Sequence, residues 1–142
     1  MTLLEFCKMM KAVAEMQPAV NQTVENDVYL LNSLKDVEYS VFAYQQRQHR
    51  EETDFWIFSF QLFYIDRLTQ DGGNELETQS IGLEILSNII LTILEIGEGD
   101  IELYDTPIYQ PFTQKFKDEC AGDYVTVTFR VAKCSICPEE YL

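Results

Sequence analysis

One stretch of the chain, Phe55 to Leu68, carries apolar side chains on both faces of an extended strand. Its apolar members are Phe55, Trp56, Ile57, Phe58, Phe60, Leu62, Phe63, Tyr64 and Ile65. A strand with one face in water alternates apolar and polar residues, so this one must be covered on both faces. The cover can come from helices of the same chain or from a neighbouring subunit. The chain must therefore build a sheet with material packed on it.

Further strands are predicted on both sides of this one. Tyr124 to Ala132 alternates cleanly, and Tyr39 to Tyr44 also reads as a strand. Shorter strands are expected at Val28–Leu31, Ile101–Tyr104 and Ile108–Phe116, the last at an edge or bulge because it contains Pro111. The polar segment Gln45–Asp54 is predicted to be an exposed hairpin tip or mobile loop, and Ala121-Gly122-Asp123 a turn.

Two helices are predicted. The first covers residues 2–17, with Thr2 and Glu5 as a capping box and Pro18 beyond its end. The second covers residues 75–96, with a broad apolar stripe that ends at Gly97 and Gly99. Strands grouped around single helices indicate an α+β fold, a mixed, mostly antiparallel sheet with the N-terminal and central helices packed on it. The 142 residues are expected to form a single domain, 1–142, with an irregular C-terminal tail at 133–142.

The charge of the chain restricts its partners. Twenty-four Asp and Glu residues face 10 Lys and Arg, which gives a net charge of −14. A free nucleic-acid binder needs a basic surface, and an anionic membrane would repel this chain, so no membrane partner is expected. The run Ile81–Ile96 is too short and polar to span a bilayer comfortably, and the N-terminus lacks a basic leader region.

The residues capable of chemistry do not form a catalytic pattern, and no enzyme activity is expected. Cys134 and Cys137 form a C-x-x-C that could be half of a zinc site or a redox pair, but we favour two small residues of a C-terminal loop. With Cys7 and Cys120 they form no dense disulfide framework, which favours folding in a reducing cytosol. His49, the only histidine, is expected to be a solvated loop residue.

The carboxylates gather in clusters, for which a solvated charged face is the expected role. These clusters are Glu51-Glu52-Asp54, Glu95/Glu98/Asp100/Glu102 and Glu139-Glu140. None has the spacing of a known cation loop, and Asp71-Gly72-Gly73-Asn74 lacks the Lys and Ser/Thr of a phosphate loop. No metal, cofactor or catalytic residue is therefore predicted. The surplus of aromatic residues around Trp56 belongs either to the core or to a surface under a partner.

Several segments of the chain together form a familiar pattern: Phe60–Leu68, Asn74-Glu75, Gln79-Ser80, Leu86–Ile90, Ile108–Thr113 and Ala121-Gly122, followed by the alternating strand. This pattern resembles small virion proteins of tailed phages that infect Bacteroides-type hosts. The order of helix, strands, helix, strands is similar to that of tail-terminator and tail-completion proteins, over roughly residues 25 to 135. The resemblance implies a tail-terminator-like fold and a homo-oligomeric ring of six or twelve subunits. Such a ring joins the tail to the portal-side connector.

The resemblance also implies where the protein works. It would assemble in the host cytoplasm, contact other neck and tail proteins, reside in the virion and let DNA pass through its channel. A lumen lined with carboxylates would repel phosphates and keep DNA moving. The alternative is an acidic module that mimics DNA and inhibits a host nuclease. Contacts with subunits or partners are expected at Arg47, His49, Arg50, Trp56, Asp71, Gly72 and Asn74.

Overall fold

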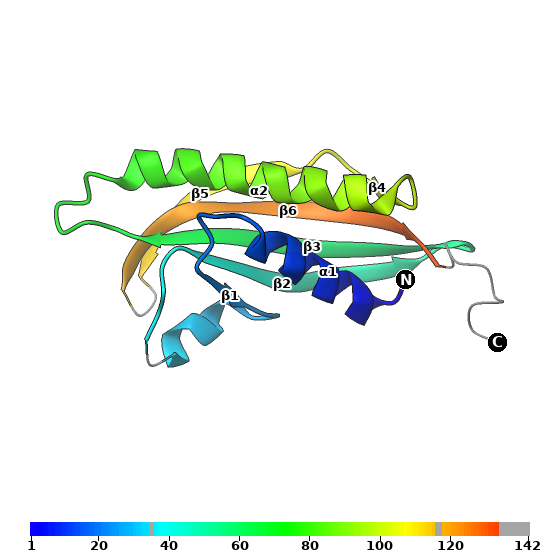
Figure 1. Ribbon diagram of the computed structural model, residues 1–142, viewed down its shortest axis with the longest axis horizontal. Helices are drawn as coiled ribbons and strands as arrows, with labels where there is room; N and C mark the ends of the chain where they lie inside the picture. Colours follow the sequence, from blue (N-terminus) through cyan, green and yellow to red (C-terminus); the bar gives the residue numbers. More distant parts are fainter. Residues whose placement is uncertain (35, 116–117, 134–142) are drawn as a thin grey trace.

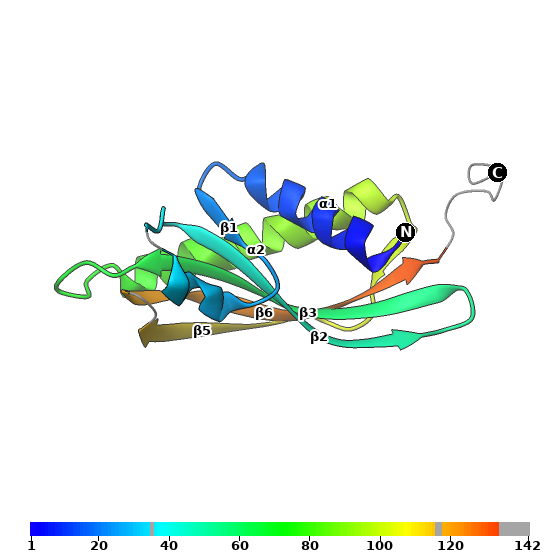
Figure 2. The same cartoon turned by 90° about the horizontal axis from the view of Figure 1, so that it is seen from below.

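The computed structural model describes residues 1–34, 36–115 and 118–133. Its elements are α1 (Leu3–Glu15), β1 (Gln22–Val24), the 3-10 helix η1 (Val28–Ser33), β2 (Val41–Glu51), β3 (Phe55–Arg67), α2 (Glu75–Gly97), β4 (Ile101–Leu103), β5 (Ile108–Lys115) and β6 (Glu119–Ala132). Both α-helices lie on the same side of one sheet (Figures 1 and 2). The predicted α+β fold with a mixed sheet under an N-terminal and a central helix is confirmed.

The sheet is built around β3 and β6. Its strand order is β1-β2-β3-β6-β4, and β5 also pairs with β6. Among the described strands, β1 and β2 run parallel, and the other pairs are antiparallel. The β3–β6 ladder runs from Phe55 opposite Ala132 to Arg67 opposite Cys120, the whole length of β3. The apolar strand that constrains the sequence therefore lies at the centre of the sheet.

Helix α1 begins where the capping box predicts. The backbone N–H of Glu5 donates to Thr2 Oγ1 over 3.1 Å, and Thr2 Oγ1 lies 3.0 Å from Glu5 Oε1. The helix ends at Glu15, two residues before the predicted end, with Met16 as its cap. Its buried face carries Phe6, whose ring lies 5.1 Å from that of Phe129 on β6. The helix is thus fixed to the centre of the sheet.

Helix α2 is the longest element and packs along β6 and β3. Its buried residues include Leu86, Ile89 and Ile93, and its cap Glu98 adopts a left-handed conformation. The run Ile81–Ile96, taken by itself, is too short and polar to span a bilayer comfortably. The whole helix has 23 residues and, by length and composition alone, could cross a membrane. In this fold its inner face covers the sheet, as the core helix of a globular domain does.

The two faces of β3 are covered unequally. Phe58, Phe60, Leu62 and Tyr64 lie beneath α1 and α2 in the main core. On the opposite face η1 closes a second, smaller cluster that contains Ile65. Beyond η1, no helix of the described residues covers this opposite face (Figure 2). The sequence predicted that both faces of β3 would be covered. One face is covered along its length by α1 and α2, and the other is covered at one end by η1.

Two segments predicted from local patterns adopt different structures. Val28–Leu31 belongs to η1 and is not a strand, because the Asp27 side chain accepts a hydrogen bond from the N–H of Tyr29 at 2.9 Å and starts a helical turn. Most of Gln45–Asp54 is not a loop, since β2 continues to Glu51 and pairs with β3 as far as Trp56. The segment is polar because, among the described strands, this part of β2 pairs with β3 alone and lies at the edge of the sheet.

The prediction of a turn at Ala121-Gly122-Asp123 was also wrong. These residues lie inside β6, where Gly122 is opposite Ile65 of β3. A Cβ on Gly122 would lie 1.8 Å from the carbonyl oxygen of Tyr64. Glycine is present here because two backbones approach closely, and not because the chain turns.

Each lateral side of the sheet carries an irregularity. Strand β5 has Pro111 opposite Asp123 in the middle of its pairing with β6. Strand β2 shifts register against β3 between Gln46 and His49, which is a β-bulge. The three-residue strand β1, which was not predicted, covers only Val41–Ala43 of β2.

Candidate interaction surfaces

The middle of the sheet, on the side opposite α1 and α2, carries a group of uncharged residues. We call it the open sheet face and define it by three cross-strand rows. One row is Gln45, Gln61, Thr126 and Ile108, the second is Phe63, Tyr124 and Gln110, and the third is Ser59 and Thr128. None of these residues is charged, although the chain carries a net charge of −14. Charged residues border these rows: Asp27 accepts from the Gln45 amide at 3.4 Å, and Arg50 and Asp105 line a recess together with Ser59 and Thr128.

Most polar groups of the open sheet face bond to their neighbours. Thr128 Oγ1 lies 3.2 Å from Ser59 Oγ, and the Tyr124 hydroxyl donates to Gln110 Oε1. The side-chain amide of Gln61, at the centre of the face and half-buried, makes no hydrogen bond to any described residue. An amide in this position has both donors and acceptors available to a partner.

A recess of about 220 Å³ lies where the open sheet face meets η1. Its lining residues are Val28, Tyr29, Gln45, Gln61, Phe63, Phe112, Gln114 and Tyr124. The rings of Phe63 and Tyr124 lie 5.5 Å apart, and those of Phe63 and Phe112 lie 6.3 Å apart. Part of the aromatic surplus noted in the sequence is thus at this surface and outside the main core.

The outer surface of α2 carries exposed leucines. Leu76, Leu83 and Leu91 are 79%, 46% and 54% exposed. Because they are seven and eight residues apart, they lie on one flank of the helix, which we call the α2 leucine stripe. The stripe is next to β5, since the Gln79 amide donates to the carbonyl of Phe112 over 3.3 Å. Ser80 and Ser87 lie between these leucines on the same flank, so the stripe is a row of separate exposed apolar side chains that a partner could cover.

Two of the acidic clusters meet at one end of the molecule. The backbone of β6 connects them, because Ala132 N–H donates to Asp100 O and Lys133 N–H donates to Asp54 O, both over 2.9 Å. Arg130 bridges them through its side chain, at 3.1 Å from Glu52 and 3.6 Å from Glu102. We call this end the acidic end. Glu139-Glu140 lies outside the described residues.

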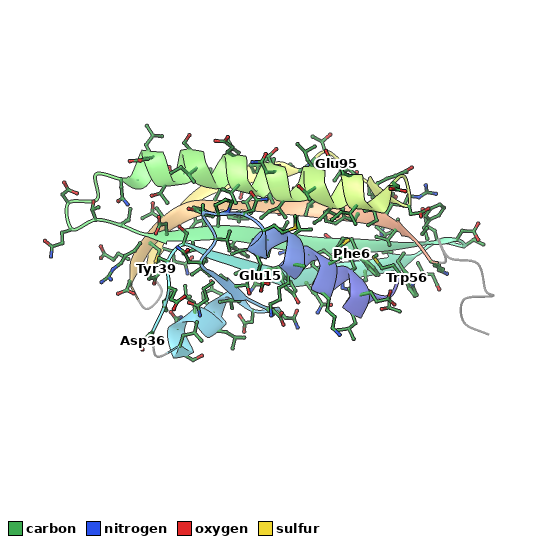
Figure 3. All side chains as sticks on the ribbon, viewed as in Figure 1. Phe6, Glu15, Asp36, Tyr39, Trp56 and Glu95 are labelled. Atoms are coloured by element: carbon green, nitrogen blue, oxygen red, sulfur yellow. The ribbon has the colours of Figure 1, made fainter. Side chains whose placement is uncertain are left out.

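The contact residues expected from the sequence lie at opposite ends of the long axis. Arg47, His49, Arg50 and Trp56 are on the β2–β3 hairpin, and the loop with Asp71, Gly72 and Asn74 precedes α2 at the other end (Figure 1). Figure 3 labels Trp56 near the hairpin end. The two groups therefore cannot form one continuous site.

The loop before α2 uses its polar groups internally. Asp71 Oδ1 accepts from Thr69 Oγ1 at 2.6 Å and from the N–H of Gly73 at 2.9 Å. Asn74 donates to the carbonyl of Arg67 over 3.1 Å, and Gly72 has a φ of 70°. These bonds fix the turn into the helix. Asp71 and Asn74 consequently have a local structural role whether or not a partner contacts the loop.

The hairpin residues differ in their surroundings. Arg47 forms no ion pair within the described part of the chain, and the Arg50 guanidinium lies 4.9 Å from the centre of the Tyr104 ring. The ring of Trp56 stacks on that of Phe58 at 6.2 Å. Trp56 therefore extends the main core toward the hairpin, and the two arginines are the side chains most available to a partner.

His49 is not a solvated loop residue. Its ring packs against Phe58 and Phe60 at 5.3 and 5.7 Å, and burial lowers its pKa. Nε2 lies 2.9 Å from Gln46 Oε1, while no group in the described part of the chain makes a hydrogen bond to the buried Nδ1. The sequence prediction failed because β2 extends through this segment and carries the ring onto the aromatic core.

The two cysteines of the described residues are enclosed. Cys7 and Cys120 are buried free thiols, and burial raises the pKa of both. A thiol with a raised pKa is a poor nucleophile. Cys134 and Cys137 lie outside the described residues. Within residues 1–34, 36–115 and 118–133, no three His, Cys, Asp or Glu side chains gather in a group that could hold a metal ion.

One carboxylate is buried between α2 and β6. Asp123 is 4% exposed, and its Oδ2 has no hydrogen-bond partner among the residues that the structure describes. Burial raises the pKa of Asp123 to about 6, against an opposing contribution from the backbone of Leu83. Gly82 makes this proximity possible, since a Cβ there would lie 3.3 Å from Asp123 Oδ2 and 2.9 Å from the Tyr64 ring.

No family model matches the chain, and no curated protein matches it. Its function is therefore inferred from the surfaces described above. The sequence contained a signal for one of them: the polar set Tyr124, Thr126, Thr128 and Arg130 alternates with buried apolar residues along β6. The alternation along β6 could not show that these residues share a surface with Gln61 and Gln45. That arrangement depends on the register between β2, β3 and β6.

Proposed function

We propose that the protein is a virion structural subunit of a phage neck or tail, in a ring that joins the tail to the portal-side connector and lets DNA pass. The observation that carries this proposal is the α2 leucine stripe. A ring forms when one surface of each subunit binds a different surface of the next and the rotation closes. An exposed apolar stripe on a rigid helix is suited to such a contact.

The energetics favour burial of the stripe in an assembly. Covering a leucine side chain fully contributes about 1.5–3 kcal/mol, so three leucines supply several kcal/mol for each contact. Repulsion between subunits of charge −14 opposes association. Salt screens that repulsion and leaves the apolar contribution in place. Assembly should therefore become stronger as the salt concentration rises.

The acidic end is the part of the subunit proposed to border the channel. Carboxylates that face a lumen repel the phosphates of passing DNA, so the DNA does not adhere. Replacing Glu95 and Glu98 by lysine in the phage should slow DNA ejection. Unchanged ejection after reversal of each described acidic cluster in turn would remove this part of the proposal.

The particle mass tests the ring. Native mass spectrometry of the wild-type protein should give six or twelve subunits, and Leu83→Glu should give a smaller particle. Leu4→Glu is the matched control, because Leu4 on α1 is 64% exposed and receives the same charge away from the stripe. A wild-type protein that never exceeds a dimer, or a ring that Leu83→Glu leaves intact, would contradict the proposal.

The alternative, an acidic mimic of DNA that inhibits a nuclease, has less support from the placement of the carboxylates. Glu77, Glu84 and Glu95 follow the outer side of α2 at separations of about 10 and 17 Å along its axis. Phosphates of one DNA strand are about 3.4 Å apart along the duplex axis. Binding of a basic nuclease by a monomer, with loss of its activity, would favour the mimic.

A further inference from the structure

We infer that the open sheet face is a second self-association surface, which packs against the same face of another copy of the chain across a twofold axis. This contact differs from the ring contact of the proposed function and does not depend on it. It would pair two subunits, and within a ring assembly it would join two rings face to face.

The first argument is the distribution of charge. A typical protein surface is about 25–35% charged. The three rows of the open sheet face contain no charged residue in a chain with 24 carboxylates. The centres of protein interfaces are depleted of charged residues and enriched in Tyr and Phe, as this face is with Phe63 and Tyr124.

The second argument concerns the occupant. Two copies with a charge of −14 each repel one another, and the repulsion is smallest where neither surface carries carboxylates. Amides and hydroxyls both donate and accept hydrogen bonds, so a face made of them can complement an identical face. The unpartnered amide of Gln61, at the centre of the face, can then bond to the other copy.

The third argument is size. Four strands at a spacing of about 4.8 Å, followed along β3 over the defined rows from Ser59 to Phe63 at about 3.3 Å a residue, outline a projected area on the order of 300 Å². A standard interface covers about 800 Å² of accessible surface on each partner. The adjoining recess beside η1 adds to the projected area, but the face remains smaller than a standard interface, so the pair is expected to be weak and to form at high protein concentration.

A charge placed at Gln61 tests the inference. Gln61→Glu puts like charges across the twofold contact and should weaken the pair by about tenfold or more, as measured by sedimentation velocity at several concentrations. Asn88→Asp is the matched control, because it makes the same amide-to-carboxylate change on the exposed side of α2. It should leave the dissociation constant of the pair within a factor of about two. Thermal unfolding of both variants checks that they remain folded.

A mixture separates a direct contact from a general loss of stability. Gln61→Lys and Gln61→Glu should each pair poorly alone and recover pairing when mixed, since opposite charges then meet across the interface. Failure of the mixture to recover, an unchanged dissociation constant for Gln61→Glu, or a wild-type protein that stays monomeric in about 0.5 M salt, where repulsion is screened, would overturn the inference. A face that binds only an unrelated protein would do the same.

The outcomes also distinguish this inference from the proposed function. If the wild-type protein forms only a dimer, and Gln61→Glu dissociates that dimer, then the open-sheet-face contact is supported and the ring is contradicted. If the wild-type protein forms a ring of six subunits, and Gln61→Glu leaves the mass of that ring unchanged, then the ring is supported and the face-to-face contact is contradicted.

Discussion

Gly122 of β6 and Tyr64 of β3 approach so closely that a Cβ on the glycine would lie 1.8 Å from the tyrosine carbonyl oxygen. The contact is backbone against backbone in the central pair of the sheet. A flexible side chain could move aside, but a paired strand cannot do so without losing register. The absence of a side chain at position 122 is thus a condition for the β3–β6 ladder.

Gly122→Ala should be the most damaging single-methyl change in the described fold. The added Cβ forces β3 and β6 apart, so we expect the free energy of unfolding to fall by more than about 3 kcal/mol, or folding to fail. Urea denaturation followed by circular dichroism measures it. Gly73→Ala is the control, because its Cβ would meet only the exposed Asp71 side chain, at 3.2 Å. A loss below about 1 kcal/mol at Gly122 would contradict the close approach.

Asp123 should make the protein less stable as the pH rises through the acid range. Its pKa in the folded state, about 6, exceeds the usual value of 3.8, so the folded state holds the proton more tightly than the unfolded state does. The stabilisation is complete below about pH 4 and is lost as the pH rises toward 6. At neutral pH, Asp123→Asn should therefore raise the free energy of unfolding by about 1–3 kcal/mol.

Urea denaturation of wild type and Asp123→Asn at pH 4.5 and 7.5 tests this expectation. The variant should gain more at the higher pH. Asp66→Asn is the control. It removes one negative charge from β3, two residues from Tyr64, which is opposite Asp123, and so measures how much any loss of negative charge stabilises this acidic chain. An equal gain from both variants at pH 7.5 would show that the net charge, and not burial of Asp123, is responsible.

His49 should titrate below its ordinary pKa. Burial against Phe58 and Phe60 disfavours the charged ring, so the folded pKa lies under 6.5. Stability from the neutral ring is present above 6.5 and decreases as the pH falls through the folded pKa. The chain has one histidine, so its ring signals in an NMR titration need no assignment by mutation. A midpoint at or above 6.5 would show that the ring is solvated.

Arg130 should contribute more to stability than an isolated surface arginine. It pairs with Glu52 and Glu102 and lies 3.5 Å from the centre of the Phe55 ring. Arg130→Met should cost about 1 kcal/mol and show a smaller loss in high salt. Arg67→Met removes a single ion pair with Asp118 that is more exposed to solvent, so it should lower the free energy of unfolding by less. Equal costs would indicate that the bridge between the acidic clusters adds nothing.

The sequence predicted the elements whose patterns are long and local. The capping residue Thr2, the apolar stripe of α2 and the alternation along β6 each depend on neighbours within one element. The errors fall where a distant segment decides the structure. Gly122 is in a strand because β3 lies against it, and the segment around His49 is extended because β3 continues beside it.

The candidate surfaces were less accessible to sequence analysis than the fold. The α2 leucine stripe and the buried residues of α2 both satisfy helical spacing, and only packing separates Leu83 from Leu86. The open sheet face combines residues from four strands, so its lack of charge could not be recognised before the register was known. The acidic end joins clusters about 50 residues apart in sequence through Arg130, which lies in neither cluster.

The irregular sides of the sheet have a consequence for how copies of this chain can join. Pro111 in β5 cannot donate a backbone hydrogen bond, and the bulge in β2 interrupts the regular spacing of donors and acceptors. Strand addition from molecule to molecule, which leads to open-ended fibrils, is therefore obstructed on both flanks. A protein with exposed apolar surface can then accumulate at high local concentration and still be confined to closed assemblies that side chains specify.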